Sequence, residues 1–217
     1  MSRLFKNKEF LKDASRVSAE VHREINMGLT VLDKIQKPIV TFFGSHKANR
    51  ENPLFEHCYN VAKHLGKDGY VILTGGDSGF AYAASLGAKD SHAESVGLQS
   101  SILKADYKID GVFTDTYSFE FLFARRFLLA IKSEALVFYP GGYSTLNELF
   151  EYLLLMETGI VDTVPIICVG REFWQGMKDW LIEEPEKSDY FSRASDLNLF
   201  TIVDTEDQVL ALVKETE

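Results

Sequence analysis

The sequence carries too little positive charge for a protein whose main partner is nucleic acid. Its 23 Lys and Arg residues are outnumbered by 32 Asp and Glu residues, which gives a net charge of -9 at pH 7. Contacts to nucleic-acid phosphates require clustered Lys and Arg, so this balance excludes nucleic acid as the main partner. An anionic ligand would have to be held by a few groups placed close to it.

Cysteines and long apolar runs are also scarce. The chain has 2 cysteines, Cys58 and Cys168, both in apolar patterns and without metal-ligand spacing. We expect both to be reduced core residues of a cytoplasmic protein, and we expect no bound metal. No apolar run approaches the ~20 residues that cross a bilayer, and the acidic N-terminal segment does not suit a signal or transit peptide. We therefore expect no membrane association.

The spacing of apolar residues predicts one α/β domain preceded by a helical extension. Residues 1–35 place apolar side chains at near-helical intervals, at Phe10, Ala14, Val17, Val21 and Ile25. We interpret this segment as an accessory helix that packs on the body of the protein or on a partner subunit. Residues 36–217 alternate short apolar strands with helices, which predicts a Rossmann-like nucleotide-binding domain with an open parallel sheet and helices on both faces. The predicted strands are residues 38–44, 70–76, 94–99, 110–117, 134–139, 164–170 and 199–204.

Two glycine-rich loops follow predicted strands and lead into predicted helices. One is residues 74–79 and the other is residues 140–145. Ligands of open parallel sheets bind beyond the carboxyl ends of the strands, and free N–H groups at a helix start suit a phosphate. The first loop has neither the G-x-G-x-x-G order of a dinucleotide site nor the Gly-Lys-Ser/Thr of a P-loop. We assign to substrate or phosphate binding Gly75, Gly76, Gly79, Gly141, Gly142, Tyr143, Ser144 and Thr145.

The segment PGGYSTLNE, residues 140–148, resembles the PGGxGTxxE motif of the Lonely Guy family. The resemblance extends from the first predicted strand to the C-terminus, and it assigns to substrate binding the Gly44-Ser45 turn and Arg126 of the Arg125-Arg126 pair. It implies a phosphoribohydrolase that cleaves nucleoside 5′-monophosphates, such as AMP or cytokinin ribotides, to free base and ribose 5-phosphate. It also implies no metal or organic cofactor, and a homodimer or larger homo-oligomer.

The resemblance makes Glu148 the catalytic carboxylate and Arg125 its partner. Hydrolysis of an N-glycosidic bond passes through an oxocarbenium-like state, which needs a carboxylate beside the ribose. The residues alone also allow a structural role, because Thr145-Leu-Asn-Glu148 fits the capping box that starts many helices. Glu151 lies one helical turn beyond Glu148 on the same face, where it could contact the ribose or face solvent.

Three residues depart from the family pattern. Ser144 replaces the motif glycine, Arg126 replaces a lysine, and Asp77 stands where the first loop usually has a third glycine. A carboxylate that pointed into this loop would repel a ligand phosphate. We therefore hypothesise that Asp77 points outward and caps the helix that begins near Gly79, leaving the backbone N–H groups to the phosphate.

Two other functions are compatible with parts of the sequence. Ser45-His46-Lys47 is similar to the segment that attaches pyridoxal phosphate in amino-acid decarboxylases, but a chain of 217 residues is too short for that enzyme scaffold. The second alternative is a non-catalytic protein of the same fold that binds or carries a nucleotide or the molybdenum cofactor. A hydrolase would release free base from AMP, whereas a carrier would return its ligand unchanged.

Overall fold

A computed structural model describes residues 12–101, 111–187 and 200–215, so residues 1–11 of the expected extension, with Phe10, lie outside it. The described strands form one seven-stranded sheet in the order β4-β3-β2-β1-β5-β6-β7, and all neighbouring strands are parallel. The predicted Rossmann-like fold is confirmed. The strands are β1 (Ile39–Phe43), β2 (Val71–Thr74), β3 (Ser95–Ser100), β4 (Asp115–Phe119), β5 (Ser133–Phe138), β6 (Ile166–Val169) and β7 (Thr201–Val203).

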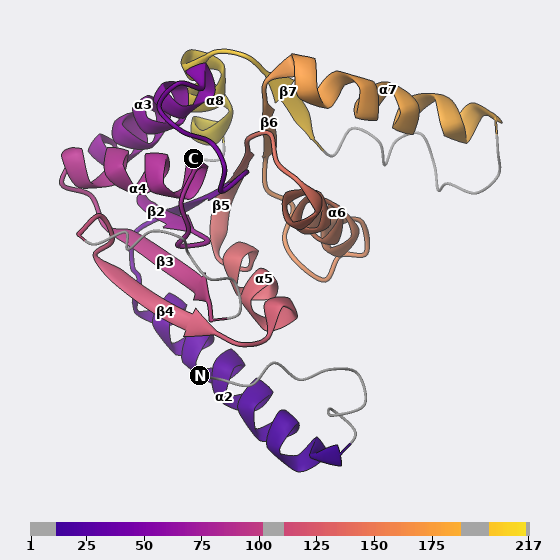
Figure 1. The fold of residues 1–217 in the computed structure, drawn as a ribbon. Coiled ribbons are helices and arrows are strands. Elements are labelled where there is room, and N and C mark those ends of the chain that lie inside the picture. Colours follow the sequence, from indigo (N-terminus) through magenta and orange to yellow (C-terminus); the bar gives the residue numbers. More distant parts are fainter. Residues whose placement is uncertain (1–11, 102–110, 188–199, 216–217) are drawn as a thin grey trace.

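Helices cover both faces of this sheet, and each face has its own apolar core (Figure 1). One core joins the sheet to α3, α4 and α8, and the other joins it to α2, α5, α6 and α7. The helices are α2 (Ala14–Lys34), α3 (Pro53–Lys67), α4 (Phe80–Asp90), α5 (Leu122–Ala130), α6 (Tyr143–Glu157), α7 (Arg171–Lys187) and α8 (Glu206–Lys214).

The central strand β1 shows why the sequence folds into these layers. Successive side chains of a strand point to opposite faces, so a strand with apolar side chains on both faces can contribute to two cores. Ile39 and Phe43 pack into the core beneath α5 and α6, whereas Val40 and Phe42 pack into the core beneath α3 and α4. All of β1 is buried, as expected for a strand with neighbours on both sides.

The fourth strand lies later in the chain than predicted. The apolar pattern predicts a strand over residues 110–117, but β4 is Asp115–Phe119, and residue 110 lies outside the described parts. The reason is pairing with β3: Thr114 donates its N–H to Ser95 O, and its hydroxyl accepts the Ser95 N–H, so the ladder starts there. Long-range pairing, rather than local hydropathy, places this strand.

The helix α2 packs closely along α5 through a glycine. A Cβ added at Gly28 would lie 2.2 Å from Leu128 Cδ1 and 2.9 Å from Leu128 Cγ. Leu128 is fully buried, so it has little space into which to move. Gly28 therefore allows the two helices to approach each other at a distance that any larger residue would prevent.

Substitution of this glycine should destabilise the protein. We expect Gly28→Ala to lower the free energy of unfolding by about 1–3 kcal/mol, the usual cost of inserting a methyl group into a packed core. Gly176→Ala in α7 is the matched control, because its Cβ would meet no heavy atom of the described residues within 4 Å. It should stabilise the helix by roughly 0.5–1 kcal/mol. Equal shifts of the two variants in urea denaturation would contradict close α2–α5 packing.

Candidate functional site

Three loops meet at the carboxyl ends of β1, β2 and β5. The chain runs outward from β1 to β4 and then returns to the other side of β1 with β5, so a topological switch point lies between β1 and β5. Ligands of open α/β sheets bind at such points. Ser45, after β1, donates its N–H to Pro140 O at 3.0 Å and accepts the Phe80 N–H at 3.2 Å. These hydrogen bonds join the three loops into one surface.

The loop between β2 and α4 needs glycine at the position where it passes the loop after β1. Gly79 has φ +68°, and a Cβ there would lie 2.0 Å from Ser45 O. No larger residue could occupy this position without moving the backbone. The glycine pattern of the sequence therefore reflects close contact between two loops as well as access for a ligand.

Arg125 occupies the centre of the site. This α5 residue is 6% exposed, and its guanidinium donates from Nε to Leu98 O and from Nη2 to Gly75 O at 3.0 Å. Gly75 is required here, because a Cβ at this position would lie 2.2 Å from Arg125 Nη2. The guanidinium thereby joins Leu98 of β3 to the loop that follows β2.

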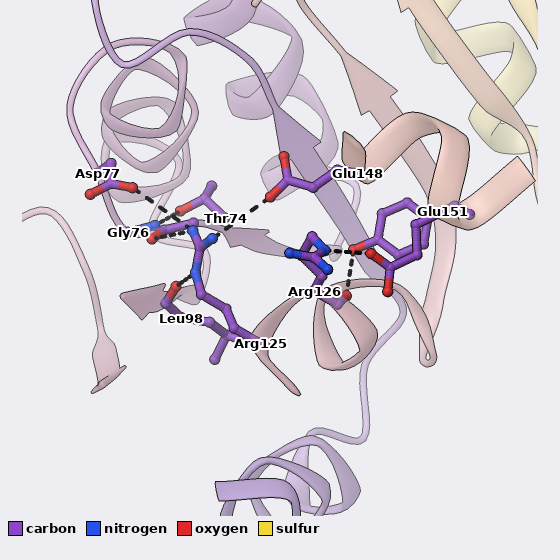
Figure 2. A network of polar contacts seen from close by, with 10 residues as sticks. Thr74, Gly76, Asp77, Leu98, Arg125, Arg126, Glu148 and Glu151 are labelled. Atoms are coloured by element: carbon purple, nitrogen blue, oxygen red, sulfur yellow. Dashed lines mark hydrogen bonds and ion pairs between the residues drawn. The ribbon is translucent and has the colours of Figure 1, made fainter. Parts of the chain in front are cut away.

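Two carboxylates flank this guanidinium on different sides (Figure 2). Asp77 Oδ2 lies 3.8 Å from Arg125 Nη2, and Glu148 Oε1 lies 3.7 Å from Arg125 Nη1. Both distances are those of ion pairs without a direct hydrogen bond. The amino groups of Arg125 that face the carboxylates therefore retain hydrogens for a ligand.

Glu148 is not a helix cap, so the capping-box interpretation of Thr145 and Glu148 is wrong. The helix α6 starts two residues before Thr145, its N-cap is Gly142, and the described residues provide no side-chain hydrogen bond at that cap. A capping box does occur in α8, between Thr205 and Gln208. Glu148 is instead a buried residue that projects from the second turn of α6 toward Arg125.

Burial changes the proton affinity of Glu148. Desolvation raises the pKa of its carboxyl from an ordinary 4.5 to about 7, against the opposing attraction of Arg125 and Arg126. Asp77 and Glu151 add smaller contributions in the upward direction. A carboxyl with a pKa near the working pH can accept and release a proton readily, as general acid–base catalysis requires.

Asp77 does not cap α4, so the hypothesis that it points outward is wrong. The N-cap of α4 is Gly79, where no side chain of the described residues accepts a hydrogen bond. The Asp77 carboxylate lies toward Arg125, and burial raises its pKa while Arg125 and His46 act in the opposite direction. The positive φ of Gly79 and the bond from Ser78 Oγ to His46 O turn the loop toward the site.

Arg126 and Glu151 form a second ion pair beside the first. Arg126 Nε donates to Glu151 Oε2, and Tyr152 OH donates to Arg126 O. The side chain of Arg126 is 20% exposed and that of Glu151 is 24% exposed, so Glu151 is not simply a solvent-facing residue. The pair connects α5 to α6, one helical turn beyond Glu148 (Figure 2).

The remaining residues assigned from the sequence form an open rim and its support. Gly142, Tyr143 and Ser144 are exposed, and Tyr143 is 93% exposed. A Cβ at Gly142 would meet no heavy atom of the described residues within 4 Å, so the space in front of α6 is open. Gly44, Gly76 and Gly141 lie behind this rim, with Thr145 buried against Gly141.

Two features of the site carry no sequence signal. Gln99 Nε2 donates to Gly76 O at 3.1 Å and so supports the first loop from β3. Glu24 of α2 accepts hydrogen bonds at the start of α5, although in the sequence it is one of several charged residues in an amphipathic helix. The described residues contain no group of three or more His, Cys, Asp or Glu placed to hold a metal. They also contain no helix long and apolar enough to span a membrane.

The fold and the site together define a Rossmann-like α/β protein with an arginine–glutamate pair at its switch point. The model of the family described as possible lysine decarboxylase, the Lonely Guy type, matches residues 82–213. The chain belongs to this family. No curated protein matches the sequence.

Several solved structures share the fold. The molybdenum cofactor binding protein of Rippkaea orientalis has a TM-score of 0.64 and 19% identity, covering 84% of this chain and 98% of that one. The molybdenum cofactor carrier protein of Chlamydomonas reinhardtii has a TM-score of 0.59 and 20% identity, covering 83% and 98%. DNA processing protein A of Streptococcus pneumoniae has a TM-score of 0.53 and 15% identity, covering 80% and 61%. At these identities the likeness establishes the fold alone.

The raised pKa of Glu148 predicts how stability depends on pH. Between about pH 4.5 and 7 the folded protein holds a proton that the unfolded chain has released, so the free energy of unfolding falls as pH rises. Glu148→Gln removes the titrating carboxyl and with it this fall in the free energy of unfolding. We expect the variant to gain stability relative to wild type between about pH 5 and about pH 8, as measured by urea denaturation. Glu157→Gln, an exposed change in the same helix, is the control. A Glu148→Gln difference that stays constant with pH would contradict the raised pKa.

Proposed function

We propose that the protein hydrolyses the N-glycosidic bond of nucleoside 5′-monophosphates, such as AMP or cytokinin ribotides, to free base and ribose 5-phosphate. The observation that carries the proposal is the buried Glu148 carboxylate 3.7 Å from Arg125, between two glycine loops at the switch point. Family membership supports the same chemistry. The site lies where an open α/β sheet binds its ligands.

The proposed reaction assigns separate roles to the two charged groups. The C1′–N bond breaks with its electron pair leaving on the base, and positive charge develops on the ribose. Ionised Glu148 stabilises that charge and takes a proton from the water whose oxygen bonds to C1′. Arg125 favours the ionised form of the Glu148 carboxylate, against the effect of burial, and offers its free amino hydrogens to the ligand. The departing base gains one proton from solvent, and Glu148 afterwards releases to solvent the proton that it took from water, so the net reaction consumes one water molecule.

The loop before α6 is the better phosphate site of the two. Free N–H groups at a helix start carry partial positive charge, and the first turn of α6 contains Tyr143, Ser144 and Thr145, which add no negative charge. The space beyond Gly142 is open among the described residues. The loop before α4 instead carries the Asp77 carboxylate, which disfavours a phosphate beside it.

A carrier function is the second candidate. The similar structures from Rippkaea orientalis and Chlamydomonas reinhardtii are titled as binding and carrier proteins for the molybdenum cofactor. Asp77 and Ser144, which depart from the family motif, fit a protein that holds a ligand without cleaving it. Incubation with AMP and chromatography of the products separates the two candidates, since only a hydrolase releases adenine.

We also propose assembly into a homodimer or larger homo-oligomer in the cytoplasm. Support comes from apolar side chains on the outer face of α6 and just beyond it, where Phe150 is 41%, Leu154 is 56% and Ile160 is 66% exposed. Contiguous exposed apolar side chains are typical of surfaces that bind another protein. Sedimentation of the purified chain measures the oligomeric state.

Substitution of the two charged residues tests the hydrolase proposal directly. We expect Glu148→Gln and Arg125→Ala each to lower the rate of adenine release from AMP by ~10²–10⁴-fold, the usual contribution of a positioned acid–base group. Glu157→Gln makes the same chemical change on the exposed part of α6 and should retain wild-type activity. A folded Glu148→Gln protein with near-normal activity would remove Glu148 from the proposed mechanism.

Asp77 should determine how well a phosphorylated ligand competes with an unphosphorylated one. Its carboxylate shares the charge of Arg125 and adds negative potential to the site. We expect Asp77→Asn to tighten binding of AMP by roughly tenfold, about 1.4 kcal/mol, and to leave adenosine nearly unchanged. Calorimetric titration with both ligands measures the difference. Asp33→Asn removes an exposed charge on α2 and serves as the control for net charge. Equal changes for AMP and adenosine would contradict an electrostatic role of Asp77.

A further inference from the structure

The N-terminal helix α2 supplies the cap of the helix that carries Arg125. The Glu24 carboxylate is 1% exposed, and its two oxygens accept the N–H groups of Glu120 and Phe121. The bond from Phe121 N to Glu24 Oε2 measures 3.1 Å. Phe121 is the N-cap of α5, and no side-chain hydrogen bond forms at this cap from its own residue in the described chain. Glu24 therefore completes the start of α5 from a separate helix.

One backbone hydrogen bond connects Phe121, which Glu24 contacts, to Arg125. The Phe121 carbonyl accepts the Arg125 N–H at 3.1 Å, in the first turn of α5. Glu24 thus accepts a hydrogen bond from the N–H of Phe121, and the carbonyl of Phe121 accepts one from the N–H of Arg125. A shift of Phe121 away from Glu24 would move the start of α5 and the arginine together.

The two helices are also joined at their other ends. Lys132, just after α5, donates from Nζ to Leu32 O at 2.7 Å and to Ile35 O at 2.6 Å, which satisfies carbonyls at the C-terminus of α2. Glu24 of α2 therefore caps the start of α5, and Lys132, which follows α5, caps the end of α2. The Lys132 end is remote from Arg125 along α5, whereas the Glu24 end is adjacent to it.

Stability alone is a weak reason for a buried carboxylate at this position. Ser, Thr, Asp or Asn at the N-cap would satisfy the start of α5 locally, without removing a charge from water. Arg23 Nη2 lies 4.0 Å from Glu24 Oε1, and the Arg23 side chain is 58% exposed. What the distant carboxylate adds is a fixed position of the first turn of α5 relative to α2.

We propose that Glu24 is a positioning residue that holds Arg125 opposite Glu148, so that α2 helps to set the geometry of the site. This inference goes beyond the accessory role expected from the sequence. It depends on the proposed hydrolase function only where activity is the readout. Glu24→Gln keeps the size of the side chain but turns an amide NH₂ toward one of the two backbone N–H groups, which forces the first turn of α5 to move.

The pKa of the Glu148 carboxyl depends on the position of Arg125, so it can be used to detect a shift of Arg125 in the absence of a ligand. Arg125 and Arg126 lower the pKa of this carboxyl, whereas burial, Asp77 and Glu151 raise it. Withdrawal of the guanidinium by about 2 Å should therefore raise the pKa by about one pH unit. Carbon-13 NMR titration of Glu148 in the full chain measures this change, with Arg125→Met as the reference for complete loss.

The matched control is Lys132→Met, which releases the far end of the same helix pair. We expect Glu24→Gln to raise the pKa of Glu148 by about one pH unit and to lower AMP cleavage at neutral pH by roughly tenfold or more. Lys132→Met should lower the melting temperature but leave the titration of Glu148 and the cleavage rate at wild-type values. Both variants are compared at a temperature where each is folded.

Identical titration of Glu148 in Glu24→Gln, Lys132→Met and wild type would overturn the inference. So would equal loss of cleavage in the two variants, because a general loss of stability would then explain both. If Glu24→Gln does not fold, Glu24→Asp withdraws the carboxylate by one methylene and supports the same comparison. Absence of AMP cleavage in wild type would refute the proposed hydrolase function, while the NMR titration would still decide the role of Glu24.

Discussion

The buried guanidinium of Arg125 is the interaction on which the site depends. It joins Leu98 of β3 to Gly75 after β2, and it lies between the carboxylates of Asp77 and Glu148. A buried charge is costly unless hydrogen bonds and an opposite charge compensate it. The guanidinium therefore depends on two carbonyls and two carboxylates, and loss of any of these four partners leaves a charged or polar group unsatisfied.

One guanidinium between two carboxylates leaves the three groups with excess negative charge when all are ionised. Burial resolves this by raising the pKa of both Asp77 and Glu148, so a proton is readily taken up when the site is closed from water. A bound anion would favour that uptake further, because it adds negative charge. Ligand binding and the protonation of Glu148 are consequently coupled through Arg125.

The sheet could be predicted from local patterns in the sequence, whereas the pairing of Arg125 with Glu148 is predicted only through the resemblance to a family motif. Apolar strands and glycine loops are visible along the chain, and so is the PGGYSTLNE segment that carries the resemblance. The direction of Asp77 and the cap from Glu24 could not be predicted, since each depends on a residue distant in sequence. Glu24 and Glu120 are separated by 96 positions. The capping-box pattern at Thr145 misled for a local reason: the helix already begins at Tyr143, with Gly142 as its N-cap.

The state of Glu148 bears on the choice between hydrolase and carrier more than the fold does. Hydrolases and carriers can share one scaffold, so a similar architecture does not separate them. A carrier has no need of a carboxyl whose charge is divided near pH 7, and burying such a group costs free energy. A hydrolase needs both features, because the group must be ionised beside the ribose and exchange a proton during turnover. The buried position of Glu148 opposite Arg125 therefore supports the proposed hydrolase over the proposed carrier.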